Sequence, residues 1–269
     1  MASLEAPVIE IPMKPDISEF SYGFALTSEL VSRFGLKTAG APTFLTQPAE
    51  GKAGGGWDVK LPGLPVFLQF KRSDYLKTSI AKDYNWFRGP YYRFKLRARR
   101  HSQQHDLLLD FEAAGNLVLY AAPMFHTPTE LGQAFTRSQV IKQSAFVSPM
   151  KIGPILDLKE HSLSFAPGNP VGLRHSEPFE VQLVDPFDEF DTGIRRRLRA
   201  AGEPVGTTSF RELGNELLDL FASRQNAEVA EAIRHLRDIS ADRNPADYAH
   251  SVARTLFDCE LLIGAGSTT

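Results

Sequence analysis

Three polar residues on two closely spaced apolar segments could together perform phosphodiester chemistry. Asp58 follows a run of three glycines, and Gln69 and Lys71 stand two positions apart in the segment VFLQFKR. A Pro-Gly pair separates the two segments, so residues 57–61 and 66–72 are predicted to form a β-hairpin. Because successive side chains of a strand point to opposite faces, Gln69 and Lys71 would lie side by side. The hairpin would then bring an acid, an amide oxygen and an ammonium group to one site.

This combination of groups is suited to a divalent cation. A cation held by Asp58, the side-chain oxygen of Gln69 and the carbonyl of Phe70 would polarise a phosphate and acidify a water molecule. Lys71 would orient that water or the hydroxide formed from it. The alternative interpretation is an ordinary hairpin with an exposed lysine and an incidental aspartate.

A further carboxylate is expected from the helix predicted over residues 17–34, which carries apolar residues at helical spacing. Its candidates are Glu19 and Glu29. Glu29 is favoured because it lies less than two turns before Gly35, where the helix is expected to stop. Glu50, in the loop before the hairpin, is a third candidate.

Positive charge is concentrated around these residues. Residues 60–105 contain eleven Lys and Arg against two acids, although the whole chain has a net charge of -2. Such a segment is typical of a surface that binds phosphates, although a solvated basic face would have the same composition. A strand predicted over residues 91–99 alternates apolar and cationic side chains. The expected nucleic-acid-binding residues are Arg72, Arg93, Lys95, Arg97, Arg99, Arg100, Gln104 and His105.

Two of the histidines have a spacing that also occurs in zinc sites. His101 and His105 are four positions apart, which would place both rings on one helical face. No cysteine pair lies near them in the sequence. A contact to DNA phosphates or to the attacking water is the second interpretation of this region, and polar residues at a helix start are the third.

The order of predicted elements indicates an α/β fold with a mixed central sheet flanked by helices. A helix, a hairpin, a strand, a helix over 102–114 and a strand over 117–121 follow one another. Residues 1–184 are expected to form this domain. Residues 207–264 are expected to form a helical C-terminal part, with its final helix running from Asn244 through Ile263.

Composition excludes several classes of protein. The chain has 269 residues, ordinary apolar and charged fractions and a single cysteine, so a small disulfide scaffold is excluded. Neither a secretory signal nor an apolar run of membrane-spanning length is present in the sequence. We therefore expect a cytoplasmic protein without a membrane partner.

The acid-bearing first helix, the Asp58 strand and the Gln69-x-Lys71 strand resemble the PD-(D/E)XK restriction-endonuclease-like fold. They are most similar to its Mrr-type branch, in which glutamine commonly replaces the acid before the lysine. The resemblance covers residues 17–122 and implies Mg²⁺ or Mn²⁺ as cofactor and DNA as substrate. It is also similar to nuclease domains of bacterial anti-phage defence systems, which act with a fused or separate sensor.

We therefore interpret the sequence as that of a metal-dependent DNA endonuclease with Asp58, Gln69, Lys71 and Glu29 at its centre. A sensor or regulatory protein and a second copy of the chain are the partners considered. The alternative is an inactive nuclease fold that serves as a nucleic-acid-binding or regulatory subunit. A third interpretation is an interaction protein that acts through its C-terminal helices.

Overall fold

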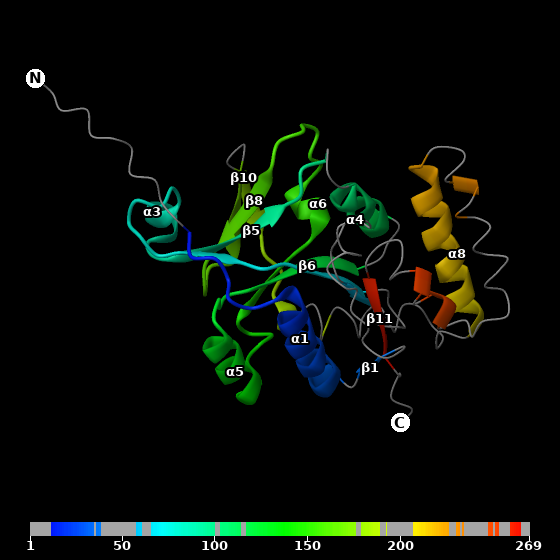
Figure 1. Ribbon diagram of the computed structural model, residues 1–269, viewed down its shortest axis with the longest axis horizontal. Helices are drawn as coiled ribbons and strands as arrows, with labels where there is room; N and C mark the ends of the chain where they lie inside the picture. The colour runs from blue at the N-terminus through cyan, green and yellow to red at the C-terminus, as the bar shows by residue number, and fades with distance from the viewer. Residues whose placement is uncertain are drawn as a thin grey trace, which may run out of the picture.

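The computed structural model describes most of the central chain and parts of both ends. The described residues are 12–34, 36–38, 58–60, 66–99, 103–113, 117–175, 179–188, 192, 207–225, 230–231, 233, 247–249, 251–252 and 259–264. Within them the chain is a mixed α/β protein, as the sequence predicts, with helices beside several sheets (Figure 1).

Helices and strands are interspersed along the described chain, with some strands following one another directly. The helices are α1 (Glu19–Phe34), α3 (Tyr84–Phe87), α4 (Gln104–Ala113), α5 (Pro128–Thr136), α6 (Pro149–Ile152) and α8 (Thr207–Ser223). The strands are β1 (Leu36–Thr38), β2 (Asp58–Lys60), β3 (Val66–Phe70), β4 (Asp74–Leu76), β5 (Tyr91–Leu96), β6 (Leu117–Pro123), β7 (Ser144–Val147), β8 (His161–Phe165), β9 (Val171–His175), β10 (Phe179–Gln182) and β11 (Cys259–Gly264).

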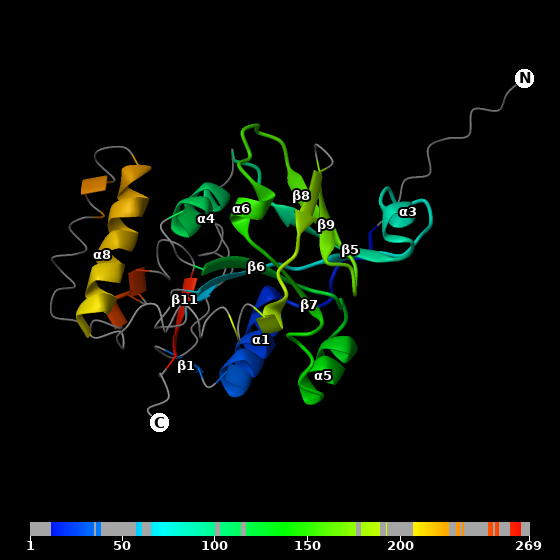
Figure 2. The ribbon, with the colours of Figure 1, turned by 180° about the vertical axis from the view of Figure 1, so that it is seen from behind.

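The central sheet has the order β3-β6-β7, with β3 and β6 parallel and β6 and β7 antiparallel. All seven residues of β6 are buried, which fits its apolar sequence LVLYAAP. Alternate residues of β6 belong to two different apolar clusters, one on each face of the sheet. Helices α1 and α5 lie on one side of this sheet, and α4 and α6 lie on the other (Figures 1 and 2).

A second sheet is antiparallel throughout and has the order β10-β9-β8-β5-β4. The apolar side chains of β5 are buried. Lys95 of β5 is exposed, and so are Arg97 and Arg99 just after the strand. The predicted alternation of this strand is therefore confirmed. Tyr92, Phe94 and Leu96 belong to the cluster that also includes residues of α4 and α8, so one face of this sheet is covered and the cationic face is left open.

The third sheet has the order β1-β11-β2 and shows one prediction to be wrong. The sequence predicts a final helix that runs through Ile263, but residues 259–264 form β11, which pairs in parallel with β2 through Cys259 opposite Asp58. The β-branched and long apolar residues of this segment suit a strand between two others. The two segments predicted to form a hairpin are the strands β2 and β3, which lie side by side. The strand pairing described for β2, however, is with β11.

Helix α1 packs on β3 through a smaller face than its sequence suggests. Its buried residues include Tyr22, Ala25 and Leu26, whereas Phe20 and Phe24 are about half exposed. A Cβ atom on Gly23 would lie 2.9 Å from the ring of Phe70, so only glycine permits this close approach. The contact brings the beginning of α1 to the residues that follow β3. No helix in the described part of the chain is long and apolar enough to cross a membrane.

Candidate functional site

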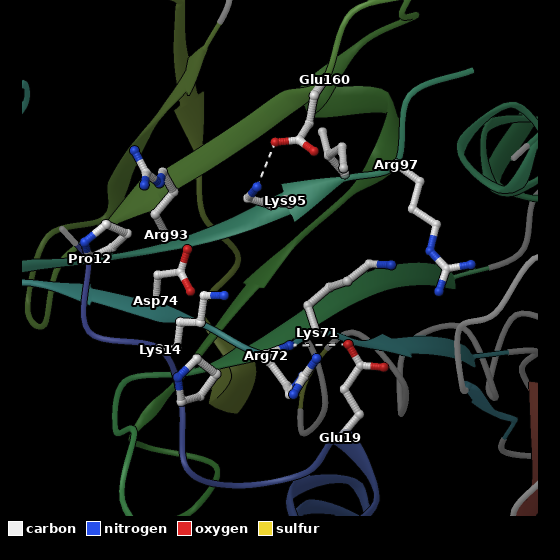
Figure 3. A pocket seen from close by; sticks show the side chains of 12 residues that line it. Pro12, Lys14, Glu19, Lys71, Arg72, Asp74, Arg93, Lys95, Arg97 and Glu160 are labelled. Atoms are coloured by element: carbon white, nitrogen blue, oxygen red, sulfur yellow. Dashed lines mark hydrogen bonds and ion pairs between the residues drawn. The ribbon is translucent and has the colours of Figure 1, made fainter. Parts of the chain in front are cut away.

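A pocket of about 540 Å³ opens where the start of α1, the end of β3 and the cationic face of β5 meet (Figure 3). Its charged lining contains twice as many cations as carboxylates. Among the described residues, the cations are Lys14, Lys71, Arg72, Arg93, Lys95 and Arg97, and the carboxylates are Glu19, Asp74 and Glu160. The excess of positive charge suits an anionic ligand.

Lys71 lies at the point where β3 ends, and the residue is only 6% exposed. Its Nζ donates a hydrogen bond of 3.2 Å to Oε1 of Gln104 on α4 and lies 5.7 Å from the centre of the Tyr120 ring. The backbone amide of Lys71 bonds to the carbonyl of Ala121, which continues the pairing of β3 with β6. These contacts hold a cation in one position at the wall of an otherwise open pocket.

Gln69 is also on β3 but lies deeper than Lys71, with no exposed surface. Neither atom of its side-chain amide has a hydrogen-bond partner among the described residues. Leaving such a buried amide without partners costs about 1–3 kcal/mol for each group. Phe70, between the two, turns its ring to the opposite face, where it contacts Tyr22 of α1. Gln69 and Lys71 therefore share one face of β3, as predicted.

The structure separates the two candidate carboxylates of α1. Glu19 lines the pocket, and its Oε1 accepts a hydrogen bond of 3.3 Å from the backbone amide of Arg72. Glu29 lies ten residues further along, roughly 15 Å at 1.5 Å per residue. Its Oε2 accepts hydrogen bonds of 2.6 and 3.3 Å from the backbone amides of Val140 and Ile141.

Glu29 is thus buried outside the pocket, and its position gives no support to the predicted role at the metal site; its second oxygen, Oε1, has no hydrogen-bond partner among the described residues. Its carboxylate satisfies backbone donors at the end of the loop between α5 and β7, and the residue is 7% exposed. The carboxylate of α1 that reaches the pocket is Glu19. Helical spacing alone could not distinguish the two, because the position along α1 that meets the end of β3 depends on how the helix docks, through Gly23 and Phe70.

Only the backbone of Asp58 belongs to the described part of the chain. It opens β2, which lies beside β3, so Asp58 is on a strand next to the one that holds Gln69 and Lys71. Glu50 and Arg100, two further predicted site residues, lie outside the described residues, as does His101.

Most of the predicted phosphate-binding cations do meet at the pocket. Arg93, Lys95 and Arg97 come from alternate positions of β5 and the residue just after it, and Arg72 comes from the segment after β3 (Figure 3). Lys95 also forms an ion pair of 2.7 Å with Glu160, in which both side chains are more than half exposed. Exposed pairs of this kind contribute little to stability, so a phosphate could replace Glu160 at low cost.

Arg99 and His105 have structural partners instead. The Nε of Arg99 donates to Oδ2 of Asp106 at 2.9 Å. The ring of His105 is buried, with Nδ1 2.9 Å from the Tyr120 hydroxyl and Nε2 2.9 Å from the carbonyl of Gly153. A carbonyl only accepts, so Nε2 carries the proton and Nδ1 accepts from tyrosine. Burial lowers the pKa of His105, which makes the neutral ring the stable form.

His105 is therefore a core residue, and its surroundings give no support to the predicted contact with DNA. Its neighbour Gln104 is half-buried and turns instead toward Lys71, where it accepts the hydrogen bond from the ammonium group. On a helix, adjacent residues point in directions about 100° apart, so Gln104 can reach Lys71 while His105 points into the core. Within the described residues, no group of three His, Cys, Asp or Glu side chains is placed to hold a metal; His101, the other member of the predicted histidine pair, lies outside them.

Three charged residues that line the pocket were not predicted from the sequence. Lys14 belongs to the arm before α1, where Met13 pairs with Tyr75 of β4 through two backbone hydrogen bonds of 2.9 Å. Asp74 and Glu160 come from β4 and from the residue before β8. Lys14 stands between two prolines in an irregular segment. No periodicity marks such a residue, so its place beside β4 follows from tertiary pairing alone.

A second polar cluster joins β8 and β9 of the five-stranded sheet to Asp83, and its polar groups bond to one another. Nε2 of His175 lies 2.8 Å from Oδ2 of Asp83 and 3.0 Å from Oγ of Ser164, and the serine hydroxyl donates to Asp83 at 3.0 Å. The pKa of Asp83 is lowered: burial would raise it, but the bonds from His175 and Ser164 and the histidine charge outweigh burial. Aspartate and serine share one ring nitrogen, so this geometry is not that of a proton relay to a nucleophile.

The residues at the end of β3 fit a hard divalent cation in their donor chemistry. Gln69 presents a buried amide without a partner in the described chain, and amide and carboxylate oxygens are the ligands that Mg²⁺ prefers. Glu19 adds a carboxylate at the pocket, while the unexplained amide of Gln69 lies on the same strand face as Lys71.

Comparison with protein-family models, with curated proteins and with solved structures finds no match for this chain.

Proposed function

We propose that the protein is a metal-dependent nuclease that hydrolyses phosphodiester bonds of DNA. The observation that carries the proposal is the meeting, in one pocket, of a held lysine, a helix carboxylate and four further cations of the predicted phosphate-binding set. Lys71 and Glu19 supply polar groups of the kind that phosphoryl transfer uses. Arg72, Arg93, Lys95 and Arg97 supply the charge that a nucleic-acid backbone requires.

Asp58 and Gln69, with Glu19 in place of Glu29, are the residues that would hold the metal ion. When bound, Mg²⁺ or Mn²⁺ supplies neutralisation of the phosphate charge and a lower pKa for a bound water molecule. The cations of β5 bind the phosphates on either side of the scissile bond. They also fix the register of the backbone across the pocket.

Lys71 is the residue proposed to act on the reacting groups. Its ammonium can orient the attacking water and stabilise the negative charge that develops on the phosphate oxygens. Gln104 is a positioning residue, because it accepts a hydrogen bond from Lys71 and keeps Nζ at the pocket. Gln104 is a neutral acceptor, so this hydrogen bond holds the ammonium without placing a negative charge against it.

The test is cleavage of plasmid DNA by the purified full chain with Mg²⁺, with Mn²⁺ and with EDTA. Lys71→Ala is expected to lower the rate at least about 100-fold, the scale seen when one group that stabilises transition-state charge is removed. Lys151→Ala is the matched control, because Lys151 is an exposed lysine on α6 outside the pocket. It is expected to leave the rate unchanged.

Two results would contradict the proposal. Cleavage that is equally fast in EDTA would remove the metal from the reaction, and cleavage that survives Lys71→Ala would remove Lys71. DNA binding that persists in EDTA, without cleavage in either metal, would instead identify a nucleic-acid-binding protein.

A further inference from the structure

The pocket has cations on two opposite walls. One wall is the arm over residues 12–15, which continues the five-stranded sheet because Met13 pairs with Tyr75 of β4. Lys14 belongs to this wall. The other wall is β5 with Arg93, Lys95 and Arg97, and the chain from Lys71 to Asp74 runs between the two (Figure 3). We refer to this space between the arm and β5 as the groove.

The width of the groove follows from strand spacing. The arm pairs with β4, and β4 pairs with β5, so β4 forms the floor of the groove, and the arm and β5 flank it two inter-strand spacings apart, or roughly 10 Å. Long cationic side chains extend into this space and narrow it further. A B-form duplex is broader, since its major groove alone is about 12 Å wide. A duplex would therefore contact one wall at a time, whereas one stacked single strand is narrow enough to contact both.

The cations also repeat along the groove. Arg93, Lys95 and Arg97 occupy every second position, and residues two apart on one strand face are separated by roughly 7 Å. Phosphates of one stacked nucleic-acid strand follow at about 3.4 Å along its axis. Each cation of β5 can thus meet every second phosphate of a single strand that runs beside it toward Lys71.

We propose that the groove binds single-stranded nucleic acid in preference to duplex. The phosphates lie between Lys14 on the arm and the cations of β5, and the strand passes Lys71 at the end of β3. The placement of the cleaved bond at Lys71 rests on the proposed nuclease function. The strand preference rests on the groove alone.

Glu160 limits this binding in the free protein. Its carboxylate pairs with Lys95 at 2.7 Å, and both groups are more than half exposed. A phosphate that reaches Lys95 displaces Glu160 and leaves that negative charge beside the bound strand. Glu160→Gln removes the competing charge, so it should increase the affinity for a single strand about threefold, the size of an exposed ion pair.

The test measures binding in EDTA, where cleavage is blocked. The full chain is titrated into a fluorescein-labelled DNA strand of about 20 nucleotides, longer than a single-strand site on one small domain. A parallel titration uses the same strand in a duplex. Anisotropy is followed from about 50 to 300 mM NaCl. The single strand is expected to bind at least about tenfold more tightly than the duplex.

A double variant tests both walls. Lys14→Ala with Arg93→Ala is expected to lower single-strand affinity at least about tenfold and to reduce the salt slope by about 0.7 for each charge removed. The matched control is Arg137→Ala with Lys151→Ala, which removes two exposed cations at the end of α5 and on α6. Circular dichroism checks that both variants fold.

Duplex binding that equals or exceeds single-strand binding would overturn the inference, as would an equal loss of affinity in the two double variants. Absence of binding to either probe would overturn it as well. Cleavage is measured separately with Mg²⁺. Single-strand preference without cleavage would refute the proposed nuclease function and support the binding groove. Cleavage without single-strand preference would support the nuclease function and refute the proposed strand preference.

Discussion

The open pocket and the buried polar contacts of the core use the same residue types in different ways. In the core, Glu29 receives two backbone amides, and His105 lies between a tyrosine hydroxyl and a backbone carbonyl. In the pocket, Glu19 receives one backbone amide and stays open to the space where Lys71 and the β5 cations meet. The difference teaches that a polar side chain enclosed in the core together with its partners holds the fold, whereas one that keeps a side open to a pocket stays available to a ligand.

This comparison predicts that substitutions in the core and in the pocket have different effects. Changes to the core residues should lower stability, and changes to the pocket residues should lower binding or cleavage with little effect on stability. The following variants test that separation, in order of their expected effect on the free energy of unfolding.

Glu29→Ala should have the largest effect. It removes the acceptor for the amides of Val140 and Ile141 and leaves two buried donors without partners, which costs about 3 kcal/mol. Denaturation by urea measures this change. Glu29→Gln retains an acceptor oxygen and should cost less than half as much. If the alanine variant were as stable as the wild type but did not cleave DNA, Glu29 would be a metal ligand and not a structural residue.

His105 should make stability depend on pH. Burial lowers its pKa in the folded chain below the ordinary value of 6.5, so the unfolded chain binds the proton first as pH falls. The stabilising contribution is complete above pH 6.5 and is lost as pH falls below 6.5 toward the folded pKa. The loss is at most about 1.4 kcal/mol per pH unit.

His105→Gln cannot titrate and should show a flatter dependence of unfolding free energy on pH below 6.5. The difference between wild type and variant isolates His105, since every other titrating group is common to both. Identical pH profiles would show that the ring is not held in its neutral form.

Glu19→Gln should have the smallest effect on stability, within about 0.5 kcal/mol, because Glu19 is partly exposed and makes one long hydrogen bond to Arg72. The amide retains an acceptor for that bond. Cleavage should nevertheless fall at least about tenfold, because the pocket loses its helix carboxylate. Full activity in this variant would leave Asp58 as the only carboxylate of the proposed site.

Local patterns were enough to predict many elements of the fold. The apolar spacing of residues 17–34 predicted α1, and the alternation of residues 91–99 predicted both β5 and its cationic face. The shared face of Gln69 and Lys71 followed in the same way from the twofold repeat of a strand. Such patterns survive because each element must bury its own apolar side.

What local patterns could not predict depended on contacts between distant segments. The placement of Glu29 and of His105 could not be derived from helical spacing, because which turn of a helix meets a pocket depends on its docking. The strand over residues 259–264 carries apolar residues that suit a helix equally well, and its pairing with β2 settles its conformation. Lys14 reaches the groove only because Met13 pairs with β4.

By itself the sequence determined the types of residue at the site, the concentration of positive charge and the faces of β3 and β5. Tertiary structure alone decided that Glu19 reaches the pocket and Glu29 does not, and that the N-terminal arm forms a second cationic wall. The physical reason is that side-chain direction within an element follows from local backbone geometry, whereas the meeting of elements depends on close packing. Here that packing includes the contact of Gly23 with the ring of Phe70.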